Sequence, residues 1–311
     1  MCTVTLITRR NGYALGMNRD EKLTRVAALP PSRLRLGGRN ILCPSEANGG
    51  TWIGVNDAGA TLALINWYSI PERVTRKAVS RGEVVRSALT ADSSTMVDQK
   101  LAGLPLDCVN PFRLIGVFPA SRAVLEWRWN LNRVERLVHG WKANTWISSG
   151  FDENGAQQTR GKTFGEALNS SGSLEWLRRL HRSHSPERGA YSTCMHRDDA
   201  ATVSYTEVTV SRYAATMRYV PGAPCSIPPA QQPRPLRSPS SVSLFRSSGE
   251  PRDHPTQVGL LPCQQARDFL RRGTAGLHLE NRASPVQFKG ATIQEELFQL
   301  ASGALDTGLC P

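Results

Sequence analysis

The sequence lacks the long apolar runs that mark membrane-spanning and secreted proteins. No stretch approaches the roughly 18 consecutive apolar residues that a membrane-spanning helix needs. The first residues are polar and strand-like, with neither the basic nor the apolar region of a signal peptide. We therefore expect no membrane span and no secretory leader.

The sequence also lacks a cysteine pattern. Its seven cysteines are odd in number, widely spaced and never paired as Cys-x-x-Cys; they stand at positions 2, 43, 108, 194, 225, 263 and 310. This spacing argues against a disulfide framework or a zinc site and favours a reducing compartment, here the cytoplasm. His181 and His184 lie three residues apart with no carboxylate at metal-ligand spacing, so we expect both to be exposed and no metal to be bound.

Motifs for nucleic-acid recognition are lacking as well, although the net charge is +12. Residues 226–311 contain nine Lys or Arg against seven Asp or Glu, a net charge of +2, which leaves +10 for residues 1–225. A solvated basic surface accounts for this charge, and a small anionic ligand is the more specific interpretation. We expect no nucleic-acid partner, and the sequence does not indicate an oligomeric state.

The N-terminal segment predicts a β-hairpin. Two runs of β-forming residues, Cys2–Thr8 and Tyr13–Asn18, flank Asn11-Gly12, a strong signal for a two-residue turn. With a turn of that length, Cys2 pairs with Glu21. The hairpin therefore brings the first thiol of the chain to residues 18–21.

Position 2 favours a nucleophile. Removal of Met1 would leave a thiol and a free α-amino group on Cys2, and an amine with a pKa of about 7.7–8.0 can act as a base for the thiol. Arg19 would favour the thiolate, while Asp20 or Glu21 would orient the ammonium group. The simpler alternative is a buried structural cysteine at the start of a strand.

Four segments carry a family resemblance: Met1–Thr3, Met17–Glu21, Gly49–Asn56 and Cys194–Arg197. They resemble the NRDE family, also called the transport and Golgi organization protein 2 family, and the resemblance extends from residue 1 to about 222. It implies an α+β protein with the four-layer αββα sandwich of the N-terminal-nucleophile hydrolases. Cysteine members of that wider superfamily, such as bile salt hydrolases and penicillin V acylases, attack non-peptide amides with their N-terminal cysteine.

The resemblance implies catalytic roles for Cys2, Arg19, Asp20 and Asn66. Asn66 ends a predicted strand, and its amide would donate to the oxyanion of the reaction. The residues expected to bind the ligand are Asn18, Glu21, Trp52, Ser149, His196 and Arg197.

Two of these residues need a separate comment, because one differs from the residue common in the family and the other is a histidine that could act as a base. Ser149 stands where much of the family has an asparagine, and its hydroxyl can still donate a hydrogen bond. For His196 we expect a structural or ligand-facing role, because the N-terminal amine already serves as the base.

The resemblance also leaves other functions open. The leading hypothesis is hydrolysis of an amide or acyl bond through Cys2, with no cofactor required. The alternative is non-catalytic binding or trafficking of haem or an acyl-CoA in the same cleft, with haem as a bound ligand. A catalytically silent scaffold is the third interpretation.

Composition predicts two regions. Residues 1–225 form the predicted family domain, and 226–311 form a Pro/Ser/Arg-rich linker and a poorly structured, disordered tail, since seven prolines fall within its first thirty residues. Short helices are expected at 264–272 and 293–300 in that tail. Within the domain we expect a loop over Lys22–Gly38 and a helix after the capping box Ser80–Glu83. Further strands are expected at 51–55, 60–67, 112–117, 123–129, 191–195, 201–210 and 213–220, and further helices at 95–101, 161–168 and 173–181.

Overall fold

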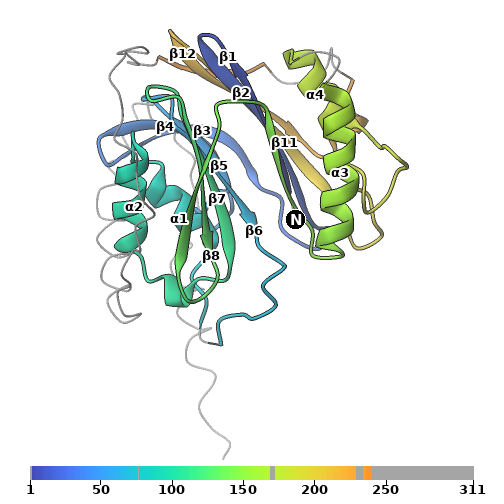
Figure 1. Cartoon of the computed structure of the whole chain (residues 1–311), viewed down its shortest axis with the longest axis horizontal. Coiled ribbons are helices and arrows are strands. Elements are labelled where there is room, and N and C mark those ends of the chain that lie inside the picture. Colours follow the sequence, from blue (N-terminus) through green and yellow to red (C-terminus); the bar gives the residue numbers. More distant parts are fainter. Residues whose placement is uncertain (1, 76, 169–171, 229–233, 240–311) are drawn as a thin grey trace, which may run out of the picture. The chain divides into compact units, whose positions relative to one another are not determined.

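The computed structural model describes residues 2–75, 77–168, 172–228 and 234–239, all of which lie in one compact unit, Met1–Phe269. The expected tail helices at 264–272 and 293–300 lie outside the described residues. Within the described part, two antiparallel sheets and two pairs of helices make an α+β fold (Figure 1).

The first sheet contains the N-terminal hairpin. Its spatial order is β10 (Asn144–Ser148), β1 (Cys2–Arg9), β2 (Gly12–Lys22), β11 (Ala200–Ser211), β12 (Ala214–Pro221), β13 (Leu236–Pro239). The strand that begins with Cys2 is therefore an inner strand, flanked by β10 and β2.

The second sheet follows the chain order strictly. Its strands are β3 (Leu29–Leu36), β4 (Arg39–Ser45), β5 (Ile53–Asn56), β6 (Thr61–Asn66), β7 (Phe112–Phe118), β8 (Ala123–Trp129) and β9 (Val134–His139). The helices are α1 (Arg81–Ala88), α2 (Ser94–Ala102), α3 (Glu153–Leu168) and α4 (Leu174–Arg182), with short 3-10 turns η1 (Leu106–Cys108) and η2 (Pro224–Ser226).

Three apolar clusters define the layers. Between the sheets, Val4 and Leu15 of the first pack with Ile65 of the second. On the outer face of the second sheet, the packed side chains include Leu62, Leu114, Trp127, Val85 of α1 and Val97 of α2. On the outer face of the first sheet, they include Ile7, Ala14, Phe164 of α3 and Leu177 of α4. The expected αββα sandwich is confirmed, with each helix pair on an outer face (Figure 1).

The alternating directions of the side chains along β1 explain why this strand lies between two layers. Val4 and Leu6 face the second sheet, whereas Thr3 and Thr5 point to the opposite, helix-covered side, as successive residues of a strand must. All four side chains are buried. The strand is therefore enclosed on both faces, and its polar face needs hydrogen-bond partners from the helical layer.

The start of α1 lies close to the loop before β5. Ser80 caps the helix, because its side chain accepts a hydrogen bond from the Gly82 N–H at 3.2 Å. A Cβ on Gly82 would lie 2.8 Å from the Cα of Gly50, so glycine allows this close approach. The predicted capping residue is confirmed, and the helix N-terminus is held against residues 49–51.

Several predicted elements need correction. The predicted loop over 22–38 contains β3, which pairs with β4 although it includes Pro30-Pro31; the register is irregular between Leu29 and Ser32, which accommodates these prolines. Residues 191–195, predicted as a strand, form turns and bends. Residues 236–239, predicted as disordered linker, form β13 against β12.

The strands expected at 112–117, 123–129, 201–210 and 213–220 are confirmed. None of the helices among the described residues combines the length and apolar character that a membrane crossing requires.

Candidate functional site

The hairpin brings Cys2 opposite Arg19, not Glu21. The turn consists of Arg10 and Asn11, and Gly12 already belongs to β2, so the register differs from the predicted one by two residues. A Cβ on Gly12, where φ is +140°, would lie 2.0 Å from the Val210 carbonyl oxygen of β11. Glycine is therefore required here for close strand packing instead of for the predicted turn.

Cys2 lies in the wall of a cavity of about 330 Å³. The predicted site residues that line it are Cys2, Arg19, Asp20, Glu21, Trp52 and Asn66. They come from the start of β1, the end of β2, the loop before β5 and the end of β6. Residues from four separate segments of the chain thus border one cavity.

The cavity also contains residues that the sequence did not predict. They include Arg25, Glu46, Asn48, Thr51, Ser80, Arg81, Gly82 and Asn110. Most of them lie in loops or at the first turn of α1, where no periodic pattern predicts which side chains converge. The capping box at Ser80 was the one available signal, because it marked the helix end that now borders the cavity.

Arg19 is the centre of an ion-pair network at the cavity wall. Its guanidinium lies 2.9 Å from Glu46 and 3.5 Å from Glu21, and it stacks over the Trp52 ring at 4.5 Å. Arg25 contacts the same two carboxylates at 2.8 and 3.0 Å. Because two arginines share two acids, the Arg19 charge is fixed in place beside Cys2.

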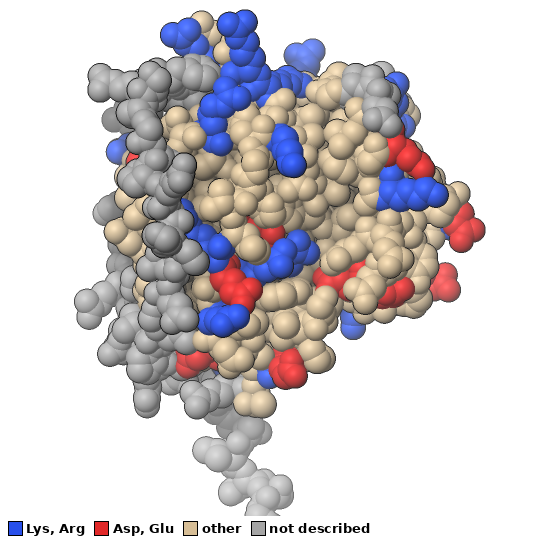
Figure 2. All heavy atoms as spheres, in the orientation of Figure 1, with Lys and Arg blue, Asp and Glu red and all other residues tan. Residues whose placement is uncertain are grey.

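The cavity as a whole is balanced in charge. It is lined by three arginines and three acidic residues: Arg19, Arg25, Arg81, Asp20, Glu21 and Glu46. Figure 2 shows acidic and basic side chains intermingled near the middle of one face, with basic side chains gathered along its upper edge. The excess positive charge of the chain is therefore not concentrated on the cavity lining.

Cys2 is a buried thiol with opposing charges around it. Its residue is 7% exposed, and burial raises the pKa of the thiol; the Asp20 charge acts in the same direction, and the Arg19 charge opposes both. The thiolate is therefore disfavoured in the resting site. A reaction through this sulfur needs a base close to it.

Asp20 has its carboxylate on the helix-covered side of the first sheet. It lies 3.1 Å from the Arg160 guanidinium of α3 and accepts a hydrogen bond from Thr202 at 2.7 Å. Arg160 is itself 1% exposed and also donates to the Thr3 hydroxyl and to the carbonyls of residues 190 and 191. Arg160 was missed because a single arginine inside a helix carries no signal for burial.

Asn66 and Arg81 border the cavity from the second sheet and from α1. The Asn66 amide donates to the Tyr68 hydroxyl at 2.7 Å, which uses one of its two N–H groups in that contact. Arg81 donates to the Pro111 carbonyl at 3.2 Å. Burial lowers the pKa of Arg81, and the nearby acidic groups of Tyr68, Cys2 and Glu21 oppose this shift.

Four predicted ligand-binding residues do not line this cavity. Asn18 donates to the carbonyls of residues 181 and 193 on the helix side, and Ser149 accepts N–H groups of residues 151 and 152. Arg197 pairs with Asp199. His196 lies in a cluster with His184, Cys194 and Cys225. These four side chains therefore lie outside the lining of the cavity that contains Cys2.

His181 was expected to be exposed, but it is fully buried. Its ring packs against Tyr205 with 5.1 Å between ring centroids, and neither ring nitrogen has a hydrogen-bond partner among the described residues. Burial, with the Arg160 charge as a second cause, lowers its pKa to about 3. The histidine faces the sheet because it belongs to the apolar stripe of α4.

The N-terminal part of the chain is similar to a known protein family. Residues 1–150 match the family described as Transport and Golgi organisation 2. The match agrees with the expected resemblance over those residues, and it ends before residues 151–222, to which the resemblance was also expected to extend. No curated protein matches the chain.

Two solved structures are similar to this chain. One is the C2A mutant of a conjugated bile acid hydrolase from Clostridium perfringens, with 9% identity, a TM-score of 0.44, and coverage of 80% of this chain and 100% of that chain. The other is a penicillin V acylase from Agrobacterium tumefaciens, with 11% identity, a TM-score of 0.41, and coverage of 71% and 84%.

Proposed function

From the match of residues 1–150 to the Transport and Golgi organisation 2 family, and from the position of Cys2 in the cavity wall, we propose that the protein is a hydrolase. It cleaves a non-peptide amide or a related acyl bond of a small molecule through Cys2. The observation that carries this proposal is the meeting of Cys2, Arg19 and Asn66 around one cavity.

The reaction begins after removal of Met1. The α-amine of Cys2 takes the thiol proton, and the sulfur attacks the carbonyl carbon of the substrate, so that a C–S bond forms. Collapse of the tetrahedral intermediate breaks the C–N bond, and the leaving amine takes the proton. Water then hydrolyses the thioester, which releases the acid and restores the thiol.

Two cavity residues assist this sequence. Arg19 opposes the rise in the Cys2 pKa, so it stabilises the attacking thiolate. Asn66 has an amide N–H beyond the one that it donates to Tyr68, and this group can donate to the oxyanion. Removal of one such donor typically lowers the rate by about 100-fold to 1,000-fold.

The cavity also indicates the substrate class. Its volume of about 330 Å³ suits a small molecule or one end of a larger one. Arg81 lines it without an ion pair to another described residue, unlike Arg19 and Arg25. We assign to Arg81 the recognition of a carboxylate on the acyl group. The reaction needs Cys2 as a free thiol, which a reducing compartment such as the cytoplasm maintains.

The second candidate function is binding of haem or an acyl-CoA in the same cavity without catalysis. It is favoured by the burial that raises the Cys2 pKa and so disfavours the thiolate. In that case Arg81 would meet a propionate or a phosphate. A visible absorbance change on haem titration, or competition by a CoA thioester, would support this function. The absence of both responses would exclude it.

The proposed hydrolysis is tested with Cys2→Ala and the matched control Cys43→Ala, another buried free thiol. Intact-mass measurement first establishes whether Met1 is absent. We then expect Cys2→Ala to abolish hydrolysis of N-acyl-amine and thioester probes, and Cys43→Ala to retain it. Retained Met1, or unchanged turnover in Cys2→Ala, would refute the proposed reaction.

A further inference from the structure

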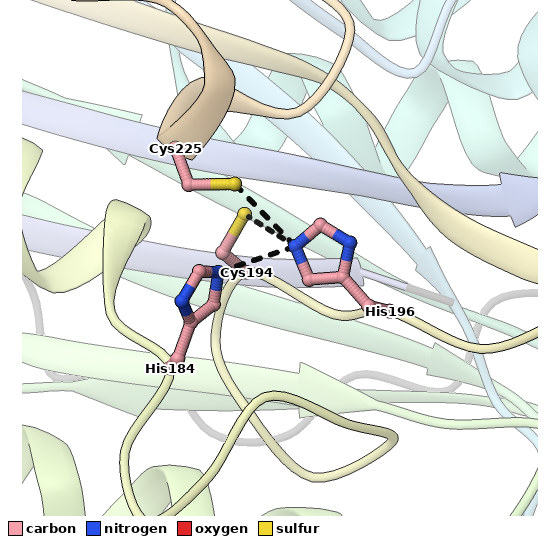
Figure 3. Close-up of side chains that lie close together, drawn as sticks. All are labelled: His184, Cys194, His196 and Cys225. Atoms are coloured by element: carbon pink, nitrogen blue, oxygen red, sulfur yellow. Dashed lines mark hydrogen bonds between the residues drawn. The ribbon is translucent and has the colours of Figure 1, made fainter.

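Four potential metal ligands converge outside the cavity. They are His184, two residues after α4; Cys194 and His196, in the loop before β11; and Cys225, in η2 after β12. Their ligand atoms all lie within 4.8 Å of one another. Figure 3 shows the two thiols and the two imidazole rings pointing toward a common centre.

The spacing of these atoms is that of a tetrahedral site. The Nε2 atom of His196 lies 3.2 Å from Nε2 of His184, 3.7 Å from Sγ of Cys194 and 3.4 Å from Sγ of Cys225. With Zn–N of about 2.0–2.1 Å and Zn–S of about 2.3 Å, a tetrahedron separates two nitrogens by about 3.3 Å and a nitrogen from a sulfur by about 3.5 Å. The observed distances fall around these values.

Hydrogen bonding alone does not account for this arrangement. The Nε2 atom of His196 faces three partner atoms, yet an imidazole nitrogen carries either one proton or one lone pair. It can therefore form a good hydrogen bond with only one of the three. A cation at the centre would engage all four side chains at once.

We propose that His184, Cys194, His196 and Cys225 bind one Zn²⁺ ion. Two thiolates and two imidazoles in a tetrahedron are a typical zinc ligand set, and four protein ligands make a closed, structural site. The ligands are separated by nine, one and twenty-eight residues, without a Cys-x-x-Cys pair. For this reason the sequence predicted no metal site.

The backbone holds the ligands in position before any metal binds. The Cys194 N–H donates to the Ser183 carbonyl at 3.0 Å, next to His184. The His196 N–H donates to the Gly189 carbonyl at 3.1 Å. Two backbone hydrogen bonds thus close the loop from 183 to 196. One lies beside His184 and Cys194, and the other lies at His196.

The same loop also contacts polar side chains on the helix-covered side of the first sheet, opposite the cavity. Its carbonyls at residues 190 and 191 accept hydrogen bonds from Arg160, which pairs with Asp20. Its carbonyl at residue 193 accepts from Asn18. The zinc ion would therefore stabilise the loop that holds Arg160 against β2 and anchors the Asn18 side chain of that strand.

Arg188 provides a further check on the proposal. Its guanidinium lies 3.3 Å from Nδ1 of His196. When zinc occupies Nε2, Nδ1 carries the proton and can no longer accept from arginine. Arg188 is exposed, so its side chain can turn away. Loss of Arg188 should therefore leave zinc affinity unchanged or increase it.

The test uses the full chain, purified under reducing conditions and titrated with Zn²⁺ or Co²⁺ alone. We expect one metal ion per chain, and for Co²⁺ the visible bands of a tetrahedral site with thiolate charge transfer. Cys225→Ser and His184→Ala should each lower the affinity by more than about 100-fold, because second-shell losses alone reach that value. Arg188→Ala and Cys2→Ala serve as controls that keep the metal.

The variants also distinguish a zinc site from a disulfide and from a cluster that binds no metal. Cys225 lies in a three-residue 3-10 turn and is only partly buried, so circular dichroism should show that Cys225→Ser remains folded. Absence of stoichiometric metal in the reduced chain would overturn the proposal. So would a disulfide between Cys194 and Cys225 in that preparation, or unchanged affinity in the two ligand variants.

Discussion

Adjacent residues of β2 face two different environments. Arg19 points to the cavity, where it shares two partly exposed carboxylates with Arg25. Its neighbours Asn18 and Asp20 point to the helix-covered side, where they are fully buried and hydrogen-bonded to α3, α4 and the following loop. The cavity face thus carries carboxylates that still reach solvent, whereas the helix face fixes the position of the strand from a fully buried side.

The difference shows how a short hairpin can support reactive chemistry. The side chains of a reactive cavity need to be held in position by the contacts behind them. Here the groups at the cavity are the Arg19 network, and the support behind them is the pair of Asp20 and Arg160. The following changes separate the two faces, beginning with the largest expected effect.

Arg160→Met should be the most destabilising change. It leaves the buried Asp20 carboxylate without its cation, and loss of one partner of a buried pair costs about 3–5 kcal/mol of unfolding free energy. Arg19→Met should cost about 1 kcal/mol or less, because Arg25 still contacts both carboxylates. Urea unfolding measures both values, and equal losses would contradict the assigned difference between the faces.

His181 makes the stability of the helix face depend on pH. Its pKa is about 3 in the folded state and about 6.5 when unfolded. As the pH falls below about 6.5, His181 binds a proton in the unfolded chain but not in the folded chain. The free energy of unfolding therefore decreases until about pH 3. The full effect is on the order of 5 kcal/mol.

His181→Leu should remove this dependence, since leucine cannot titrate. The quantity to measure is the difference in unfolding free energy between variant and wild type at pH 7, 5.5 and 4, which cancels other titrating groups. One such group is Glu126, whose pKa is held well below its usual range by hydrogen bonds from His139 and Arg128, although burial raises it. A difference that stays constant with pH would show that His181 is already exposed to protons.

The sequence predicted one of these faces better than the other. It placed Cys2 and Arg19 on a common hairpin, and the two-residue error in register left every side chain on its predicted face because strands alternate with period two. It could not predict the role of Arg160, the single arginine of its helix, whose partner lies 140 positions away. The cavity loops and the His184 cluster were missed for the same reason: their members meet only through tertiary packing.

The smallest predicted effect concerns the reactivity of Cys2. Burial raises the pKa of this thiol and the Arg19 charge lowers it, so Arg19→Met should move the pH profile of Cys2 alkylation upward. The matched control is Arg25→Met, which removes a cation from the same carboxylates but has no part in the Cys2 shift. Peptide mapping after iodoacetamide treatment isolates Cys2 from the other thiols. Equal profiles in the two variants would mean that the network acts on Cys2 only through its net charge, and that the position of Arg19 opposite the thiol has no chemical role.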